Sequence, residues 1–221
     1  MPLLIATANP AKAREFRQMF TGNAGGFGKG EFLDLSAFPN ARPVEETGQT
    51  FLQNACLKAV GYARQIGADW ALADDSGLEV DALGGAPGVF SARWAARRGI
   101  VPPTGDADAD NNATLLRELA DVPDDRRSAR FVCVLALADS RGQVIATVRR
   151  TIEGVVLRER RGSNGFGYDS LFFVPELGKT TGELSPADKH RISHRGRALA
   201  ALSELIAERH WTDLLGMARI H

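Results

Sequence analysis

Two adjacent carboxylates interrupt an apolar stretch of the sequence, where Asp74 and Asp75 stand in "ALADDSGLEV". Side chains alternate across a β-strand, so the two carboxylates cannot both face one site while the strand continues. We expect one of them to meet a solvent-filled cleft and the other to bind backbone, Lys or Arg. Ser76 and Gly77 follow directly, which places Asp75 where the predicted strand ends. Ligands of α/β proteins bind at such strand ends.

Glu45 and Glu46 offer further carboxylate oxygens just before a predicted helix. Mg²⁺ needs only one or two protein carboxylates, because phosphate and water oxygens complete its shell. The acidic residues are therefore candidates for a magnesium site. The alternative is that the two glutamates only complement the positive N-terminus of the helix behind them.

The stretch "TANPAK" predicts a phosphate-binding turn between a strand and a helix. Asn9 stands where an N-cap belongs, and Pro10 suits the first helical position. The unpaired N–H groups of a helix N-terminus attract phosphate, to which Thr7 would add a donor and Lys12 a cation. The alternative is that Asn9 only caps the helix and Lys12 is solvated. The sequence has no GxxxxGK[ST] phosphate loop.

An aromatic ring stands between two glycines in "GFGYD". Gly165 and Gly167 would let the backbone approach a ligand closely and leave one face of Phe166 open for stacking on a base. The alternative is a tight turn that packs Phe166 and Tyr168 into the core.

Hydrogen-bond donors gather in "DKHRISHRG", which contains Lys189, His194 and Arg195. A buried donor cluster would favour a purine with a carbonyl at position 6 over one with an amino group, since adenine would leave donors facing donors. The alternative is a solvated helix start.

The elements that must position these residues alternate between strand and helix. Strands are expected at residues 3–6, 32–35, 70–73, 129–139, 143–156 and after 169, with residues 129–156 forming an antiparallel hairpin. Helices are expected from residue 10, over 50–66 with Gly67 as terminator, after the polar stretch 106–112 to near 119, and from Ser185 and Ser193. A Gly-rich loop is expected at 23–30. This pattern predicts an α/β fold in one domain over residues 1–221, with two lobes around a cleft.

The composition narrows the class of protein further. The 27 Lys and Arg residues balance the 27 Asp and Glu residues, which argues against a non-specific nucleic-acid partner. Cys56 and Cys133 lack metal-site spacing and are expected to be buried free thiols. The N-terminus is unlike a signal peptide, and no apolar run approaches the roughly 18 residues that span a membrane. We therefore expect a cytoplasmic protein with no membrane partner.

Six stretches together resemble the inosine-triphosphate pyrophosphatase family. They occur in the family's order between residue 4 and about residue 200: "TANPAKAREF", "EETGQTFLQNACLKA", "ADDSGLEVDALGGAPGVFSARWA", "VPDDRRSARFVCVLAL", "GFGYDSLFFVPELGKT" and "DKHRISHRGRAL". The resemblance implies a homodimer with a long central mixed β-sheet flanked by helices, and two lobes around an active-site cleft. It also implies Mg²⁺-dependent hydrolysis of dITP, ITP and XTP to the monophosphate and pyrophosphate, which cleanses the nucleotide pool.

The resemblance also assigns roles to single residues. Asp75 would be the catalytic carboxylate and a metal ligand, Glu46 the second metal ligand, and Ser76 a substrate contact. The triphosphate would be bound by Thr7, Ala8, Asn9, Pro10, Ala11 and Lys12, where Ala8 replaces the family's usual Gly. The nucleotide site would be lined by Phe166, Gly167, Tyr168 and Asp169, with Phe166 stacking on the base, and the purine would be read by Lys189, His194 and Arg195. In the mechanism that we expect, which is our own addition to the resemblance, Lys12, Lys58 and the first-turn amides would stabilise the departing pyrophosphate.

Three other function classes compete with this interpretation. A purine-nucleotide-binding sensor would have the same pocket without turnover, although it would have little need for two metal-ready carboxylates. A general phosphatase acting on monophosphates would release inorganic phosphate without preferring a 6-oxo purine. An interaction scaffold would leave the polar turn clusters unexplained.

Overall fold

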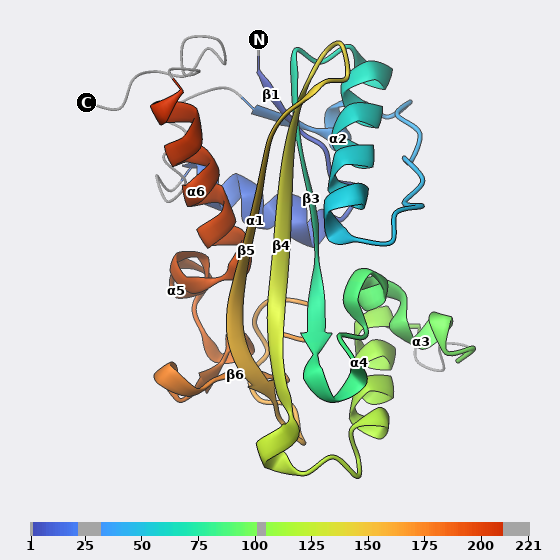
Figure 1. Cartoon of the computed structure of the whole chain (residues 1–221), viewed down its shortest axis with the longest axis vertical. Coiled ribbons are helices and arrows are strands. Elements are labelled where there is room, and N and C mark those ends of the chain that lie inside the picture. Colours follow the sequence, from blue (N-terminus) through green and yellow to red (C-terminus); the bar gives the residue numbers. More distant parts are fainter. Residues whose placement is uncertain (1, 22–31, 101–104, 210–221) are drawn as a thin grey trace. The chain divides into compact units, whose positions relative to one another are not determined.

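The computed structural model describes residues 2–21, 32–100 and 105–209, and within them strands and helices alternate (Figure 1). The strands are β1 (Leu3–Ile5), β2 (Phe32–Asp34), β3 (Trp70–Val80), β4 (Ser128–Asp139), β5 (Val144–Val156), β6 (Phe172–Val174) and β7 (Lys179–Thr180). The α-helices are α1 (Pro10–Thr21), α2 (Phe51–Ile66), α3 (Trp94–Arg97), α4 (Ala107–Glu118), α5 (Pro186–Ile192) and α6 (His194–Glu208). Short 3₁₀ turns occupy Leu35–Ala37, Asp81–Leu83, Gly88–Arg93, Asp124–Arg126, Pro175–Leu177 and Thr181–Glu183.

The described strands form one sheet in the order β2-β1-β3-β4-β5-β6-β7. β1 runs parallel to both neighbours, with Leu3 opposite Phe32 and Leu4 opposite Ala71. β6 runs antiparallel to β5 and to β7. The sheet is therefore mixed, and the predicted α/β class is confirmed.

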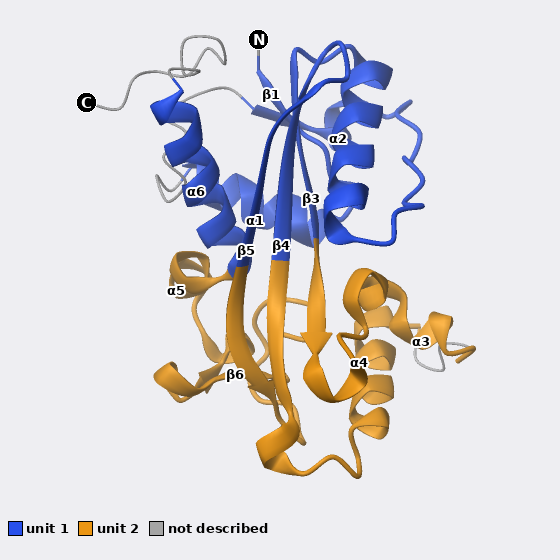
Figure 2. Cartoon of the chain, in the orientation of Figure 1, with its two compact units in different colours: residues 1–75, 133–150, 194–221 blue, residues 76–132, 151–193 orange. Residues whose placement is uncertain are grey.

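The chain divides into two compact units (Figure 2). Unit 1 consists of residues 1–75, 133–150 and 194–221, and unit 2 of residues 76–132 and 151–193. The active-site cleft and the single functional domain over residues 1–221 stay predictions.

The core of unit 1 lies between its strands and the helices α1 and α6. Phe16, Met19 and Phe20 fall on one face of α1 because they are spaced by three or four residues, and all three are buried. They pack in one apolar cluster with Leu199 and Leu202 of α6 and with side chains of β1, β3, β4 and β5. This packing holds the second half of α1 against the strands of unit 1.

The core of unit 2 is formed by α4, by β6 and by the parts of β3, β4 and β5 that belong to this unit. Leu115 and Leu119 are fully buried at the end of α4, among side chains of β3, β4, β5 and β6. The rings of Phe131 and Phe172 pack with their centroids 4.5 Å apart. Tyr168 belongs to the same cluster, which anchors the segment that follows Phe166.

Most predicted elements are confirmed. α2 begins after Thr50, whose side chain accepts from Gln53 in a capping box, and it ends at Gly67 in the left-handed conformation. β4 and β5 are neighbours joined by a short turn, and α5 and α6 begin after Ser185 and Ser193. The Gly-rich loop at 23–30 lies outside the described residues.

Two boundary predictions were wrong. The strand predicted to end at Asp75 continues as β3 to Val80, so both aspartates lie in its middle. Lys12 and Arg195 pair with Asp74, and Lys58 pairs with Asp75. Because both buried charges are compensated, the strand need not end there. The stretch 106–112 is not a lead-in but the N-cap and first turns of α4, because Asp106 accepts from the N–H groups of Asp108 and Ala109.

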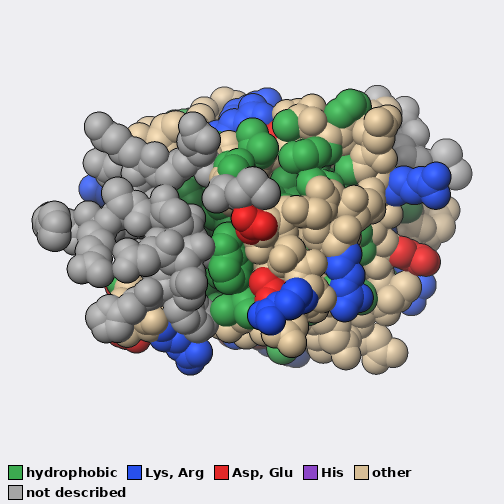
Figure 3. Space-filling model, turned by 90° about the horizontal axis from the view of Figure 1, so that it is seen from above, with side chains coloured by type: hydrophobic (Ala, Val, Ile, Leu, Met, Phe, Trp, Pro, Cys, Tyr) green, Lys and Arg blue, Asp and Glu red, His purple; other side chains and the backbone are tan. Residues whose placement is uncertain are grey.

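The distribution of surface charge and the length of the helices bear on possible partners of the protein. Lys and Arg side chains lie in small separate groups, with Asp and Glu side chains among them, on the face shown in Figure 3. Among the described residues, the helices are too short or too polar to cross a bilayer.

Candidate active site

The N-terminus of α1 is organised by its two preceding polar residues. The Asn9 side-chain oxygen accepts from the N–H groups of Ala11 at 2.9 Å and Lys12 at 3.1 Å. The N–H of Asn9 donates to the Thr7 hydroxyl at 3.2 Å. The predicted N-cap is confirmed. Lys12 is not solvated, because its side chain is only 13% exposed and its Nζ lies 3.0 Å from Asp74.

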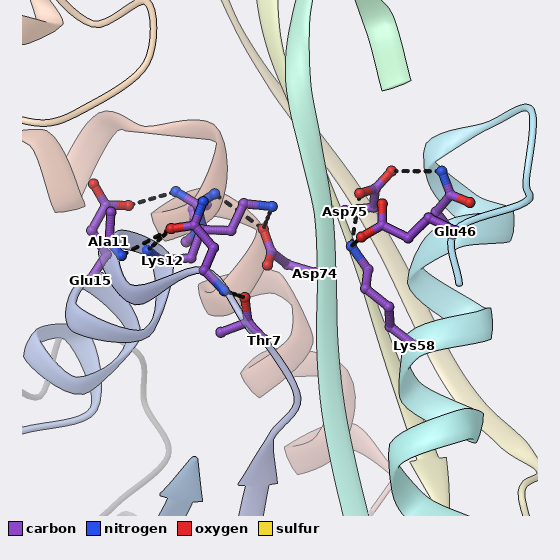
Figure 4. A network of polar contacts seen from close by, with 11 residues as sticks. Thr7, Ala11, Lys12, Glu15, Glu46, Lys58, Asp74 and Asp75 are labelled. Carbon is purple, nitrogen blue, oxygen red and sulfur yellow. Dashed lines mark hydrogen bonds and ion pairs between the residues drawn. The ribbon is translucent and has the colours of Figure 1, made fainter. Parts of the chain in front are cut away.

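Asp74 is the centre of a buried ion network in unit 1 (Figure 4). Its Oδ2 lies 3.0 Å from Lys12 Nζ and 3.1 Å from Arg195 Nη2, and Arg195 Nη1 lies 2.5 Å from Glu15. Burial alone would raise the pKa of Asp74, but the charges of Lys12, Arg195 and Lys58 outweigh it and hold this pKa far below its usual range. Burial likewise disfavours the charged form of Arg195, yet the carboxylates of Asp74 and Glu15 raise its pKa. Asp74 is therefore ionised and fixed.

Asp75 points away from Asp74, toward α2 (Figure 4). Its Oδ1 accepts from Lys58 Nζ at 2.8 Å, and the same Nζ lies 3.3 Å from Glu46 Oε1. Asn54 Nδ2 approaches the other Asp75 oxygen at 3.4 Å. The expected alternation of the two aspartates is confirmed, although each of them is buried and each binds a lysine.

The charges around Asp75 shift two pKa values. Burial raises the pKa of the Asp75 carboxyl; the charges of Lys58 and Lys12 offset this only in part, and Glu46 adds to it. Burial would lower the pKa of Lys58, but the carboxylates of Asp75, Asp74 and Glu46 raise it. Lys58 therefore stays charged, whereas Asp75 accepts a proton more readily than an exposed aspartate does.

Glu46 and Asp75 converge on one cation, the ammonium group of Lys58. The described residues contain no group of three or more His, Cys, Asp or Glu side chains that could hold a metal ion alone. Two carboxylates suffice for Mg²⁺ when phosphate and water oxygens complete the shell, so the donor set fits that ion. Glu45 is exposed, which leaves Glu46 as the glutamate directed at this site.

The loop around Phe166 in unit 2 is held by Asp169. One oxygen of this carboxylate accepts from the N–H of Phe166 at 2.8 Å and from Lys189 Nζ at 2.5 Å, while Thr181 donates to the other at 2.8 Å. Lys189 Nζ lies 5.1 Å from the centre of the half-buried Phe166 ring. Tyr168 is buried, and its hydroxyl donates to the carbonyl of Ser91 at 2.9 Å. Tyr168 thus packs in the core, as the alternative proposed.

The donor residues near the C-terminal helices are buried. Lys189 lies in α5, and His194 and Arg195 open α6; their exposed fractions are 4%, 6% and 1%. The solvated-helix alternative was therefore wrong. Arg195 contacts Glu15 and Asp74, and Lys189 contacts Asp169. The purine-reading role of these residues and the substrate contact of Ser76 stay predictions.

Two residues of this network were missed in the sequence analysis. Glu15 follows Lys12 by three residues on α1, and Asn54 precedes Lys58 by four residues on α2. Helical spacing of three or four places each pair on one face, so both residues could have been found from their functional neighbours.

Fold and site together define an α/β protein with a capped helix N-terminus and a pair of carboxylates around one buried lysine. The family model described as "Ham1 family" matches residues 3–205. The chain belongs to the Ham1 family.

Named relatives and solved structures agree with this membership. The chain is 47% identical over 212 residues to the dITP/XTP pyrophosphatase of Exiguobacterium sibiricum, covering 94% of this chain and 100% of that one. It is 45% identical to the protein of the same name from Geobacillus kaustophilus, covering 97% and 96%. The structure of a HAM1 protein from Coxiella burnetii matches with a TM-score of 0.79 at 38% identity, covering 94% of this chain and 99% of that one.

Proposed function

We propose that this chain is a nucleoside-triphosphate pyrophosphatase that hydrolyses dITP, ITP and XTP to the nucleoside monophosphate and pyrophosphate, with Mg²⁺ as cofactor. The relatives named above are called dITP/XTP pyrophosphatases, which supports the reaction and two of the three substrates. The observation that carries the proposal is the convergence of Glu46 and Asp75 on Lys58. A catalytic carboxylate and a cation are what the hydrolysis of a phosphoric anhydride needs.

In the proposed reaction, Asp75 orients a water molecule and takes its proton as the oxygen attacks the α-phosphorus. The bond from the α-phosphorus to the bridging oxygen breaks, and pyrophosphate leaves with that oxygen. Burial raises the pKa of Asp75, which suits a group that must accept a proton near neutral pH. Glu46 and Asp75 would hold Mg²⁺. A bound Mg²⁺ would neutralise part of the negative charge of the phosphates.

Lys12, Lys58 and the N-terminus of α1 would stabilise the negative charge of the departing pyrophosphate. Lys12 is held by Asp74, and the turn before α1 is fixed by the side chains of Thr7 and Asn9, so these donors need little reorganisation. Lys58 would exchange its ion pair with Asp75 for phosphate oxygens when the substrate and its metal arrive.

The oxo-purine preference is proposed to come from Phe166 and Lys189. A ring with a cation 5.1 Å from its centre can stack on a base, and a lysine offers donors only. A carbonyl at position 6 of the purine would accept from such a donor, whereas an amino group would not. We also propose that the protein is a homodimer, which light scattering would test directly.

The test is to incubate the protein with ITP and, separately, with ATP, each with Mg²⁺, and to identify the phosphate product. The proposal expects pyrophosphate and IMP from ITP, and turnover of ATP slower by at least about a hundredfold. Inorganic phosphate as the product would indicate a phosphatase. Tight binding of ITP without any product would indicate the nucleotide sensor.

A further inference from the structure

Both backbone polar groups of Gly167 in unit 2, its N–H and its carbonyl, form hydrogen bonds with side chains of one helix. The carboxylate of Asp108, in the first turn of α4, accepts from the N–H of Gly167 at 2.7 Å. The side-chain amide of Asn112, one turn later, donates to the carbonyl of Gly167 at 2.8 Å. Asp108 and Asn112 are four residues apart, so both side chains leave the same face of α4. One helix face thus satisfies both polar groups of a single loop residue.

The orientation of the Asn112 amide follows from its partners. Its nitrogen also donates to the carbonyl of Asp108 at 2.6 Å. Carbonyl oxygens only accept hydrogen bonds, so the group that contacts both of them must be the NH₂ group and not the side-chain oxygen. Asn112 is 1% exposed. The NH₂ group of this buried side chain has two acceptors, and losing them would leave its donors unpaired, which is costly.

These contacts fix the main chain on both sides of Phe166. The peptide N–H before its Cα donates to Asp169 at 2.8 Å, and the peptide N–H after it donates to Asp108 at 2.7 Å. Each acceptor is a carboxylate, which makes these bonds stronger than neutral ones. With both flanking peptide groups held, the direction in which Phe166 projects from the chain is set.

We propose that Asp108 and Asn112 are positioning residues for nucleobase recognition: they fix Gly167 so that Phe166 is already oriented to stack on the purine. This inference rests on the role of Phe166 in the proposed function. Preorganisation removes the ordering cost of the loop from the binding free energy, so loss of Asp108 should weaken binding of the base and not of the phosphates.

The experiment compares the wild type with Asp108→Ala, Asp108→Asn and Asp106→Ala. Asp106 caps the same helix without touching Gly167, so Asp106→Ala measures the effect of a weaker α4 alone. Dissociation constants for ITP and for inorganic tripolyphosphate are measured by calorimetry in EDTA, which needs no turnover. KM and kcat for ITP with Mg²⁺ and the melting temperature are measured alongside.

Asp108→Ala is expected to weaken ITP binding and raise KM roughly tenfold, with kcat and the tripolyphosphate constant nearly unchanged. Asp108→Asn keeps an acceptor for the N–H and should restore most of the affinity. In a Phe166→Ala background, the further change Asp108→Ala should have no added effect on ITP binding, because the residue acts through the ring.

The inference is overturned if Asp108→Ala weakens ITP and tripolyphosphate alike, if Asp106→Ala has the same effect, or if the two losses add in the double variant. Asn112→Ala provides a second route to the same answer, since it removes the other contact to Gly167. Failure of the proposed function is seen separately, in a wild type that yields no pyrophosphate from ITP. The calorimetric comparison of ITP with tripolyphosphate still decides the inference in that case.

Discussion

Asp74 and Asp75 are neighbours in β3, yet their side chains form ion pairs with lysines of different helices. Asp74 Oδ2 lies 3.0 Å from Lys12 of α1, and Asp75 Oδ1 lies 2.8 Å from Lys58 of α2. The pKa of Asp74 is lowered and that of Asp75 is raised, although burial acts on both in the same direction. Asp74 has two close cations, whereas Asp75 shares one with Glu46. We therefore propose that Asp74 serves stability and that Asp75 serves the chemistry.

The first prediction contrasts the stability of two variants. Asp74→Asn leaves Arg195 and Lys12 without their shared carboxylate in a buried site, and it should lower the free energy of unfolding by about 3–5 kcal/mol. Asp75→Asn removes a charge that burial already disfavours and leaves Glu46 as a partner for Lys58, so it should cost less, about 1–2 kcal/mol. Denaturant unfolding of both variants gives the comparison. Equal destabilisation would contradict the assignment of different roles.

The second prediction concerns the cation between Glu46 and Asp75. In Lys58→Met the two carboxylates face each other without a positive charge, so Mg²⁺ should bind there more readily than in the wild type. The rise in melting temperature on adding Mg²⁺ should be about twice the wild-type rise or more. Arg64→Met on the exposed side of α2 is the matched control and should behave as the wild type does. A variant that Mg²⁺ stabilises no more than the wild type would argue against a metal at this position.

The third prediction separates backbone strain from a steric clash in the Phe166 loop. Gly165 and Gly167 both have positive φ, at 79° and 59°. A Cβ at Gly165 would lie 2.0 Å from the Asp169 carboxylate, which Lys189 and Phe166 hold in place, whereas a Cβ at Gly167 meets no atom within 4 Å. Gly167→Ala should cost about 1–2 kcal/mol of unfolding free energy from strain alone. Gly165→Ala should lower the free energy of unfolding by more than this and should raise KM for ITP. Denaturant unfolding of both variants checks the difference, and equal losses would show that the Asp169 side chain can move aside.

The fourth prediction concerns the two cysteines. Burial raises the pKa of Cys133 to about 12, with a smaller contribution from the charge of Asp74, and burial also raises the pKa of the half-buried Cys56. The thiolate is the reactive form, so a raised pKa means slow alkylation near pH 8. In Cys56→Ala, N-ethylmaleimide should label nothing in the native protein and one thiol after unfolding in guanidinium. Rapid labelling of native Cys56→Ala would show that Cys133 is accessible.

Local signals in the sequence were sufficient for the caps and for the opposed aspartates. Asn9 and Thr50 cap the helices they precede because their side chains bond to residues two or three positions away. The opposite directions of Asp74 and Asp75 follow from strand alternation alone. Each of these features depends on a few consecutive residues.

Features that depend on distant partners could not be predicted in this way. β3 continues through two aspartates because Arg195, 121 residues further along the chain, binds Asp74. The loop at Phe166 is held by Asp108, which is 59 residues away from Gly167. The polar stretch 106–112 has the composition of a loop. It is helical because Asp106 caps it and because Asn111 and Asn112 bond to distant backbone groups, which the local sequence does not reveal.

The most direct test of the account compares turnover with binding in Asp75→Asn. If Asp75 carries out the chemistry, kcat for pyrophosphate release from ITP should fall by about 10³-fold or more, while the dissociation constant for ITP changes by less than about tenfold. The variant keeps the shape of the side chain, removes its charge and basicity, and replaces one acceptor oxygen with an NH₂ group. Parallel losses of turnover and of ITP binding would contradict the account, because Asp75 would then be a binding residue and the catalytic group would lie elsewhere.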